Sequence, residues 1–311
     1  MRQKIEQRPE RSLWAVATDA PDYTDDLRLA HVLADDADSL TTARFKALDL
    51  HVMSKPDLTP VTDADRAVEE GIRRTLSRVR SRDAVTGEEE GTTGSGSRRW
   101  IVDPIDGTKN FVRGVPVWAT LISLAVDDEV VLGVVSAPQL QRRWWASTGA
   151  GAWTGRSLLK ASPCQVSDVR RLEDASFSYA SLDGWDERGR LDDLTSLMRR
   201  CWRTRAYGDF WSYMLLAEGA VDLAAEPELE VYDMAALEVI VREAGGRFTS
   251  LDGAEGPWGG NALASNGHLH EAALSFLGSP AEGPDRPEDP DDPRPTGASV
   301  SQLHPRRPRE D

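Results

Sequence analysis

The sequence predicts a layered α/β protein in which mixed or antiparallel sheets alternate with helices. Segments rich in β-branched residues come in pairs joined by short polar turns, a pattern typical of hairpins. Segments with helical periodicity separate these blocks. No GxGxxG string follows a predicted strand, which argues against a dinucleotide-binding parallel sheet. Strand pairs in blocks between helices therefore favour packed layers over a regular βαβ repeat.

Two amphipathic helices are expected near the start of the folded part. Between Leu27 and Leu40 the apolar residues recur at helical spacing. A second helix should begin near Thr62 or Asp63, where short polar residues can serve as its N-cap. Its expected buried stripe is Val68, Ile72, Leu76 and Val79. Asp63 is thus expected at the mouth of this helix.

The middle of the chain reads as β structure. ATLISLAV (Ala119–Val126) and VVLGVVSA (Val130–Ala137) flank the turn residues DDE and predict an antiparallel hairpin. Trp144, Trp145 and the GAGAW segment continue this β character.

The last third predicts two helices with a strand between them. We expect a helix around Phe210–Glu218, a short strand near Val221–Ala224 and a helix over Met234–Glu243 that ends at Gly245 and Gly246.

Composition limits the class of protein. The chain has 311 residues and a formal charge of −15, which disfavours non-specific binding to nucleic acid or to an anionic membrane. Its apolar runs are too short for a membrane span, its start lacks the apolar core of a secretory signal, and its two cysteines give no disulfide framework. We expect a cytoplasmic protein whose partners are small molecules and cations.

The chain divides into three parts by composition. Residues 1–21 carry scattered apolar residues without periodicity and are expected to form a flexible extension. Residues 279–311 are rich in Pro and Asp and are expected to form a disordered tail. The folded domain is predicted to span residues 22–278.

The string WIVDPIDGTKNF (Trp100–Phe111) carries the strongest chemical signal. An apolar strand runs directly into Asp103, and Pro104 disfavours a helix there. The carboxylates of Asp103 and Asp106 can then converge with the Ile105 carbonyl on one cation, and oxygen-only ligation suits Mg²⁺. Gly107 lets the backbone approach closely, so amides from this point could cradle an anion. Taken alone, the string could also be a turn in which Asp103 caps a helix.

Two further acidic motifs have ordinary structural explanations when taken alone. GEEEG (Gly87–Gly91) places three acids between glycines, which invites a cation but also fits a solvated loop. Asp233 precedes a helical segment and could be a plain N-cap, as could Asp63.

Together the motifs resemble the inositol monophosphatase family of metal-dependent phosphatases. The four that match, in the expected order, are DLTPVTDAD (Asp57–Asp65), GEE (Gly87–Glu89), WIVDPIDGTKNF and YDMAALEVIVREAGG (Tyr232–Gly246). The resemblance covers about residues 25–278. It implies the αβαβα sandwich of the inositol monophosphatase and fructose bisphosphatase type, hydrolysis without a phosphoenzyme, and a homodimer.

The resemblance also implies roles for single residues. Those that match the family's metal ligands, for two to three Mg²⁺ ions, are Glu88, Asp103, Ile105 through its carbonyl, Asp106 and Asp233. Asp63 and Thr108 match the pair that orients a water for in-line attack on phosphorus. Glu88, Ile105, Asp106, Gly107, Thr108 and Asp233 are also expected to contact the substrate.

In this family, the segment that matches Arg205–Asp233 determines which substrate is bound. It resembles the actinobacterial histidinol-phosphatase subgroup more than true inositol monophosphatases, which implies hydrolysis of L-histidinol phosphate in histidine biosynthesis. Asp209 and Glu226 could each receive an amine, although Asp209 could instead cap the following helix. Arg205 is expected to contact the substrate or to hold Asp209.

Other functions remain open at this stage. Inositol 1-phosphate is the first alternative substrate, followed by fructose bisphosphate and nucleotide bisphosphates. A haloacid dehalogenase-type phosphatase would need Asp-x-Asp-x-Thr, and the spacing here is one residue too long. The chain could also be a catalytically silent metal-binding protein, but its intact set of ligands argues against this alternative.

Overall fold

The computed structural model of the chain describes residues 22–55 and 60–278. The predicted N-terminal extension and the predicted tail both lie outside these residues, so the three-part division of the chain stays a prediction.

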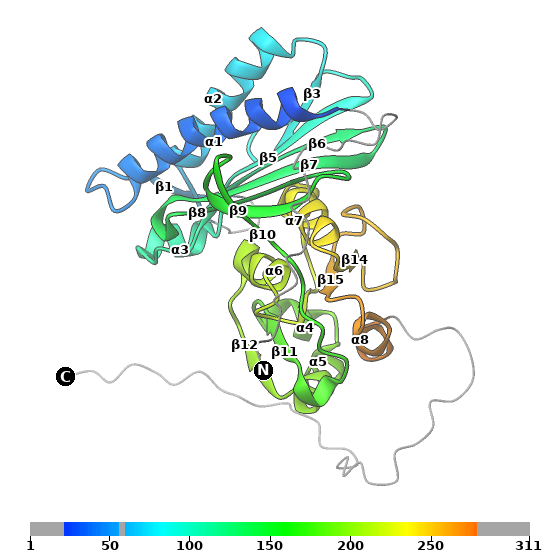
Figure 1. Cartoon of the computed structure of the whole chain (residues 1–311). Helices are drawn as coiled ribbons and strands as arrows, with labels where there is room; N and C mark the ends of the chain where they lie inside the picture. The colour runs from blue at the N-terminus through cyan, green and yellow to red at the C-terminus, as the bar shows by residue number, and fades with distance from the viewer. Residues whose placement is uncertain (1–21, 56–59, 279–311) are drawn as a thin grey trace, which may run out of the picture. The chain divides into compact units, whose positions relative to one another are not determined.

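The described residues form five layers (Figure 1). Helices α1 (Thr24–Arg44) and α2 (Asp63–Val79) cover one face of an eight-stranded sheet, and α7 (Val231–Glu243) packs on its other face. A five-stranded sheet lies beyond α7 and α6 (Asp209–Ala217). The outermost layer consists of three short helices, α4 (Asp183–Glu187), α5 (Leu191–Arg200) and α8 (His270–Leu277). The αβαβα arrangement expected from the sequence is confirmed.

The eight-stranded sheet has the order β10-β9-β8-β7-β6-β5-β3-β4. In sequence order these strands are β3 (Ala84–Gly87), β4 (Gly91–Thr93), β5 (Arg98–Asp106), β6 (Ala119–Val126), β7 (Glu129–Ala137), β8 (Arg142–Ser147), β9 (Gly151–Ser157) and β10 (Lys160–Pro163). Neighbours pair antiparallel except β3 and β5, which are parallel.

The five-stranded sheet is mixed and has the order β12-β11-β13-β15-β14. Its strands are β11 (Ser176–Tyr179), β12 (Arg203–Arg205), β13 (Leu223–Glu226), β14 (Arg247–Thr249) and β15 (Ala262–Ser265). The remaining regular elements are the hairpin of β1 (Val52–Ser54) and β2 (Pro60–Thr62), helix α3 (Thr108–Arg113), and 3₁₀ turns at Pro138–Leu140 and Leu172–Asp174.

The expected elements are present, with three shifts at their ends. Val79 closes α2 with 50% exposure, so the buried stripe of that helix ends at Leu76. The strand expected near Val221 begins two residues later, at Leu223. Helix α7 begins at Val231, before the expected Met234, because Glu230 and Asp233 form a capping box that extends the helix by almost one turn.

A bulge in β5 shapes the end of this strand. Asp103 pairs with Leu121 and Asp106 with Ala119, so β5 contains one more residue than β6 over this stretch. Pro104, which cannot donate to a ladder, lies inside the bulge, and its carbonyl accepts a hydrogen bond from Thr120 Oγ1 at 2.8 Å. The bulge releases the Ile105 carbonyl and turns Asp106 toward the same region as Asp103.

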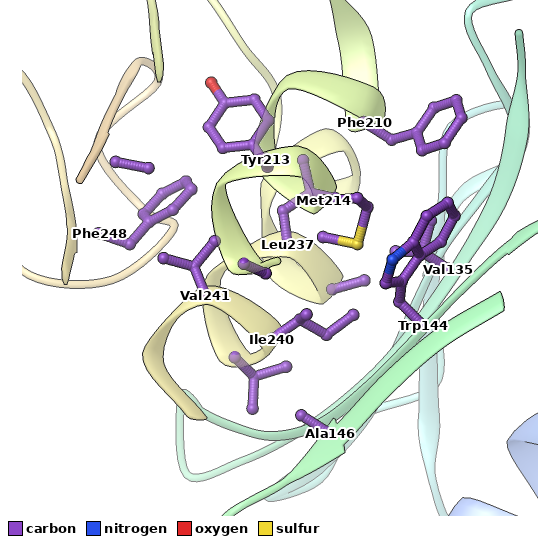
Figure 2. Close-up of a cluster of buried hydrophobic side chains, with 14 of the residues drawn as sticks. Val135, Trp144, Ala146, Phe210, Tyr213, Met214, Leu237, Ile240, Val241 and Phe248 are labelled. Atoms are coloured by element: carbon purple, nitrogen blue, oxygen red, sulfur yellow. The ribbon is translucent and has the colours of Figure 1, made fainter. Parts of the chain in front are cut away.

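The main core fills the space between the eight-stranded sheet and the two middle helices (Figure 2). Val135 and Trp144 of the sheet face Met214 of α6 and Leu237 and Ile240 of α7. Each large apolar side chain buried in this way contributes about 1.5–3 kcal/mol to folding. The dense packing holds the start of both helices against the end of β5.

None of the helices in the described ranges has the length and apolar character that crossing a bilayer requires.

Gly133 allows the close contact between β7 and α7, and its replacement tests this packing. A Cβ there would lie 2.7 Å from Val239 Cγ1 and 2.8 Å from the Ala236 carbonyl oxygen. We expect Gly133→Ala to destabilise the protein by about 1–3 kcal/mol, a drop of roughly 3–10 °C in Tm by calorimetry.

Gly71 in α2 provides the matched control. A Cβ there meets no atom within 4 Å, so Gly71→Ala should raise stability by about 0.5–1 kcal/mol through helix propensity. Equal effects of the two alanines would contradict the packing argument.

Candidate active site

The parallel pairing of β3 with β5 brings two acidic motifs together. Gly87 at the end of β3 pairs with Val102, and the Glu88 amide donates to the Val102 carbonyl at 3.3 Å. Because parallel strands end at the same edge of a sheet, Glu88 follows β3 next to Asp103 of β5. The two residues are far apart in sequence only because β4 and a loop intervene.

A first carboxylate cluster consists of Asp103, Asp106 and Asp233. One oxygen of each lies within 4.8 Å of the others. Asp103 is 2% exposed, and its Oδ1 has no hydrogen-bond partner among the described residues. Asp233 reaches the cluster from the first turn of α7, where its Oδ2 also accepts the Glu230 amide at 2.7 Å. It therefore belongs to the capping box expected of a helix start and to the acidic site at once.

A second carboxylate cluster consists of Asp65, Glu88 and Glu89, again with oxygens within 4.8 Å of one another. The Lys55 ammonium lies 2.5 Å from Glu88 Oε1 and 2.7 Å from Glu89 Oε1. Although burial lowers the pKa of Lys55, the hydrogen bonds and charges of the two glutamates raise it above its ordinary value. Lys55 thus supplies positive charge to an acidic cluster.

Burial and mutual repulsion raise the pKa values of these acids. The pKa of Asp103 lies well above 3.8 because of burial first, then the charges of Glu88, Asp106 and Asp233. For Asp233, burial is again the largest cause, and its pKa rises to about 7. Groups this strongly perturbed and placed together are typical of functional sites.

The Thr108 hydroxyl contacts Asp65 and not Asp63, the residue expected to share its role. Thr108 Oγ1 lies 2.8 Å from the Ile105 carbonyl oxygen and 3.4 Å from Asp65 Oδ1. Asp63, the first residue of α2, instead pairs with Arg44 at 2.7 Å. The structure thus does not bring Asp63 and Thr108 together, and the role expected of Asp63 stays a prediction.

The capping box of α2 explains this difference. Asp65 folds back over the helix mouth, and its Oδ2 accepts hydrogen bonds from the Thr62 amide and hydroxyl at 2.8 and 2.5 Å. Its Oδ1 remains directed at Thr108. The pattern Thr62-x-x-Asp65 is a capping-box signature, so the sequence did contain a signal for Asp65. Burial first, then Glu88 and Glu89, raise the pKa of Asp65 to about 6 despite the bonds from Thr62.

Asp209 lies beside the first cluster at the start of α6. The helix has Gly208 as its N-cap and no side-chain capping bond, so Asp209 is not a cap. Its backbone has φ 50, a left-handed conformation that few non-glycine residues adopt. Asn110 Nδ2 donates to Asp209 Oδ2 at 3.2 Å, and the neighbouring Phe210 amide donates to Asp106 Oδ2 at 2.6 Å.

Glu226 completes this acidic region from the end of β13. It is 6% exposed, and its Oε1 has no hydrogen-bond partner within the described ranges. Burial, then the charges of Asp209 and Asp233, raise its pKa well above 4.5. Arg205, in contrast, is exposed on β12 and donates to the Thr204 carbonyl. No ion pair between Arg205 and Asp209 is present.

Comparison with known proteins identifies the family and the fold. The sequence model of the inositol monophosphatase family matches residues 25–278. The chain belongs to this family. It is 64% identical over 261 residues to a histidinol-phosphatase of Streptomyces coelicolor, a match that covers 83% of this chain and 98% of that relative. A histidinol-phosphatase of Mycobacterium tuberculosis is 59% identical over 255 residues, 81% of this chain and 98% of the relative.

A solved structure agrees with the family assignment. The extragenic suppressor protein suhB of Bartonella henselae matches with a TM-score of 0.75 at 29% identity, over 83% of this chain and 100% of that one. The resemblance to the inositol monophosphatase family and to its actinobacterial histidinol-phosphatases, expected from the four motifs, is confirmed.

The acidic clusters fit the metal dependence of the inositol monophosphatase family. Both clusters offer only oxygen atoms, the donors preferred by hard divalent cations. Asp103 Oδ1 is buried without a partner, and its neighbours are all carboxylates, so the site lacks positive charge where it needs it. The oxygen atoms expected to hold such cations belong to the carboxylates of Glu88, Asp103, Asp106 and Asp233 and to the Ile105 carbonyl. Their individual roles stay predictions.

The raised pKa of Asp233 predicts how stability depends on pH without metal. Between about pH 4 and pH 7 the folded state binds more protons than the unfolded state, so stability falls as pH rises. Asp233→Asn removes this cost. In EDTA, calorimetry should show the variant more stable than wild type by roughly 2 kcal/mol at pH 8, after solvent screening of a partly exposed group. The difference should fall to about a quarter of this value near pH 4.5.

Asp192→Asn is the matched control, because Asp192 is an exposed acid in the first turn of α5. It should leave the pH profile unchanged. A stability difference for Asp233→Asn that is the same at pH 4.5 and pH 8 would show that its pKa is not raised.

Proposed function

We propose that this protein is a Mg²⁺-dependent phosphomonoesterase that hydrolyses L-histidinol phosphate to L-histidinol and phosphate. The observation that carries the choice of substrate is the pair Asp209 and Glu226, two acids next to the metal-binding cluster. The identity to two histidinol-phosphatases supports the same substrate.

The reaction requires water to attack phosphorus while the P–O bond to the alcohol breaks. Thr108 and Asp65 are placed to orient that water, since the Thr108 hydroxyl lies between the Ile105 carbonyl and Asp65 Oδ1. A pKa of about 6 makes Asp65 suitable to accept a proton near neutral pH. When bound, Mg²⁺ ions supply Lewis-acid chemistry, offsetting the phosphate charge and making water more acidic. The departing alkoxide takes a proton from solvent or from one of the protonated carboxyl groups of the acidic clusters.

The phosphate is expected at the junction of β5 and α3. Gly107 has φ 83 and precedes α3, whose first-turn amides lack intrahelical acceptors. A Cβ on Gly107 would lie 3.3 Å from Asp209 Oδ2. Asp209 Oδ2 therefore lies beside Gly107, and it accepts a hydrogen bond from Asn110 of α3. A substrate bound through its phosphate would thus present its remaining groups to the acidic region.

Charge favours histidinol phosphate over a neutral polyol phosphate. Histidinol phosphate carries an ammonium group and an imidazole, and both can pair with carboxylates. Asp209 and Asp233 already repel Glu226, so a cation there relieves repulsion that a neutral hydroxyl would leave. Arg205 is exposed and forms no ion pair with Asp209. Of its two expected roles, we therefore keep only contact with the substrate.

Three finer expectations belong to this proposal. We expect two to three Mg²⁺ ions per chain, a homodimer and a cytoplasmic location. Calorimetric titration and light scattering would measure the first two directly.

A small substrate panel tests the proposal. With Mg²⁺ present, phosphate release should be fastest from histidinol phosphate, compared with inositol 1-phosphate, fructose 1,6-bisphosphate and 3′-phosphoadenosine 5′-phosphate. Asp209→Asn, which keeps the shape and tolerates the left-handed backbone, should lower kcat/KM for histidinol phosphate about 10–100-fold through the lost charge pair. Hydrolysis of p-nitrophenyl phosphate, which has no cation, should change less than about threefold by the same arithmetic.

Preference for inositol 1-phosphate would keep the phosphatase mechanism and discard the substrate. If Asp209→Asn lowered kcat/KM equally for histidinol phosphate and p-nitrophenyl phosphate, Asp209 would support the reaction centre and not selectivity.

Asp65 and Asp63, the two acids in the first turn of α2, allow a direct comparison. Asp65→Asn should lower kcat about 10²–10⁴-fold, the usual contribution of a general base. Asp63→Asn should stay close to wild type, because its carboxylate pairs with Arg44. Steady-state kinetics on histidinol phosphate, with circular dichroism as the folding control, would measure both. Loss of activity in Asp63→Asn alone would restore the prediction made from sequence.

A further inference from the structure

Glu69 is a buried acid beneath the loop that carries Glu88. It lies on α2, four residues after Asp65, and is 0% exposed. The loop above it, Gly87–Gly91, contains three consecutive glutamates. Neither the metal ligands nor the substrate contacts proposed above include Glu69.

The Glu69 carboxylate holds two consecutive amides of this loop. Oε2 accepts the Glu89 amide at 2.8 Å, and Oε1 accepts the Glu90 amide at 3.0 Å. These bonds fix the backbone immediately after Glu88. Because hydrogen bonds to an ionised acceptor are stronger than neutral ones, a buried carboxylate constrains this turn well.

Arg73, one turn further along α2, fixes Glu69 and the far side of the loop. Its Nε donates to Glu69 Oε1 at 2.8 Å, and its Nη1 donates to Thr93 Oγ1, also at 2.8 Å. Its Nη2 donates to the Gly91 carbonyl. The guanidinium thus joins α2 to the end of the loop and supplies the counter-charge that a buried carboxylate needs.

Gly87 shows how closely Glu69 approaches the loop. A Cβ on Gly87 would lie 2.2 Å from Glu69 Oε1 and 2.3 Å from its Cδ. The side chain of Glu69 therefore occupies the place a larger residue would need. Glu69, strand β5 and Arg73 thus each hold a different part of this loop.

We propose that Glu69, fixed by Arg73, is a positioning residue that holds the Glu88 and Glu89 side chains in place for metal binding. The inference rests on the proposed role of Glu88 as a ligand. Lys55 offsets only part of the repulsion among the three adjacent glutamates, so a loop without a backbone anchor would spread them apart. Anchored at two amides, it keeps Glu88 beside Asp103 and Glu89 beside Asp65.

The test measures Mg²⁺ binding to the full-length, metal-free protein by isothermal titration calorimetry, without substrate. Glu69→Gln keeps the size of the side chain but loses the charge that holds two amides and Arg73. It should weaken Mg²⁺ binding about 10–100-fold, as changes to groups that orient ligands usually do. In assays, the Mg²⁺ concentration for half-maximal rate should rise by a similar factor, while kcat at saturating Mg²⁺ stays near wild type.

Glu70→Gln is the matched control. Glu70 is the next residue on the same helix, and it pairs at 3.7 Å with Arg74 in an exposed i,i+4 contact. Its loss removes the same charge from the same helix but no contact to the loop, so Mg²⁺ affinity should not change.

Two further variants make every result decisive. Glu88→Gln should weaken Mg²⁺ binding; if it does not, the assignment of Glu88 as a ligand fails. If Glu88→Gln weakens binding and Glu69→Gln lowers only Tm, the positioning role is overturned while the metal site stands. Should Glu69→Gln not fold, Arg73→Lys gives the same readout, since it keeps the charge at Glu69 and loses the bonds to Thr93 and Gly91. Unchanged Mg²⁺ affinity in that variant would overturn the inference.

Discussion

Repulsion among buried carboxylates is the constraint on which the rest of this structure depends. Asp103, Asp106 and Asp233 converge within 4.8 Å, as do Asp65, Glu88 and Glu89, although burial and like charge both oppose this. Only a rigid scaffold can hold such groups together, because free loops would separate them. The large sheet supplies that rigidity through its parallel β3–β5 pair and the bulge that ends β5.

The helices do more than cover the sheets. The first turn of α2 contributes Asp65, the start of α6 contributes Asp209, and the first turn of α7 contributes Asp233. All three helices deliver their acids from their N-terminal ends, where the positive end of the helix dipole favours negative charge. Met214 and Ile240 pack α6 and α7 on the sheet. This packing therefore sets the positions of Asp209 and Asp233 as well as filling the core.

The site has two sides with different demands. The edge formed by β3, β5 and α3 offers oxygen ligands and amides, which suit cations and phosphate. The side formed by Asp209 and Glu226 offers mainly negative charge, which suits a cationic organic group. Asn110 joins them, since it donates to both the Val117 carbonyl and Asp209. One continuous set of contacts thus links the two sides.

The sequence by itself determined the layered fold, the hairpin of Ala119–Ala137 and the acids of the four motifs. These signals are local: period-two and helical patterns, a proline that disfavours a helix at Asp103, and acids grouped between glycines. Only the tertiary structure shows that Thr108 contacts Asp65 and not Asp63, because Thr108 lies 43 residues away from Asp65 in the sequence. It alone separated Glu69 from Glu70, since both precede an arginine by four residues and only burial beneath the loop distinguishes them. Likewise, the contact of Asn110 with Asp209 spans 99 residues, and such distances close only when the layers pack.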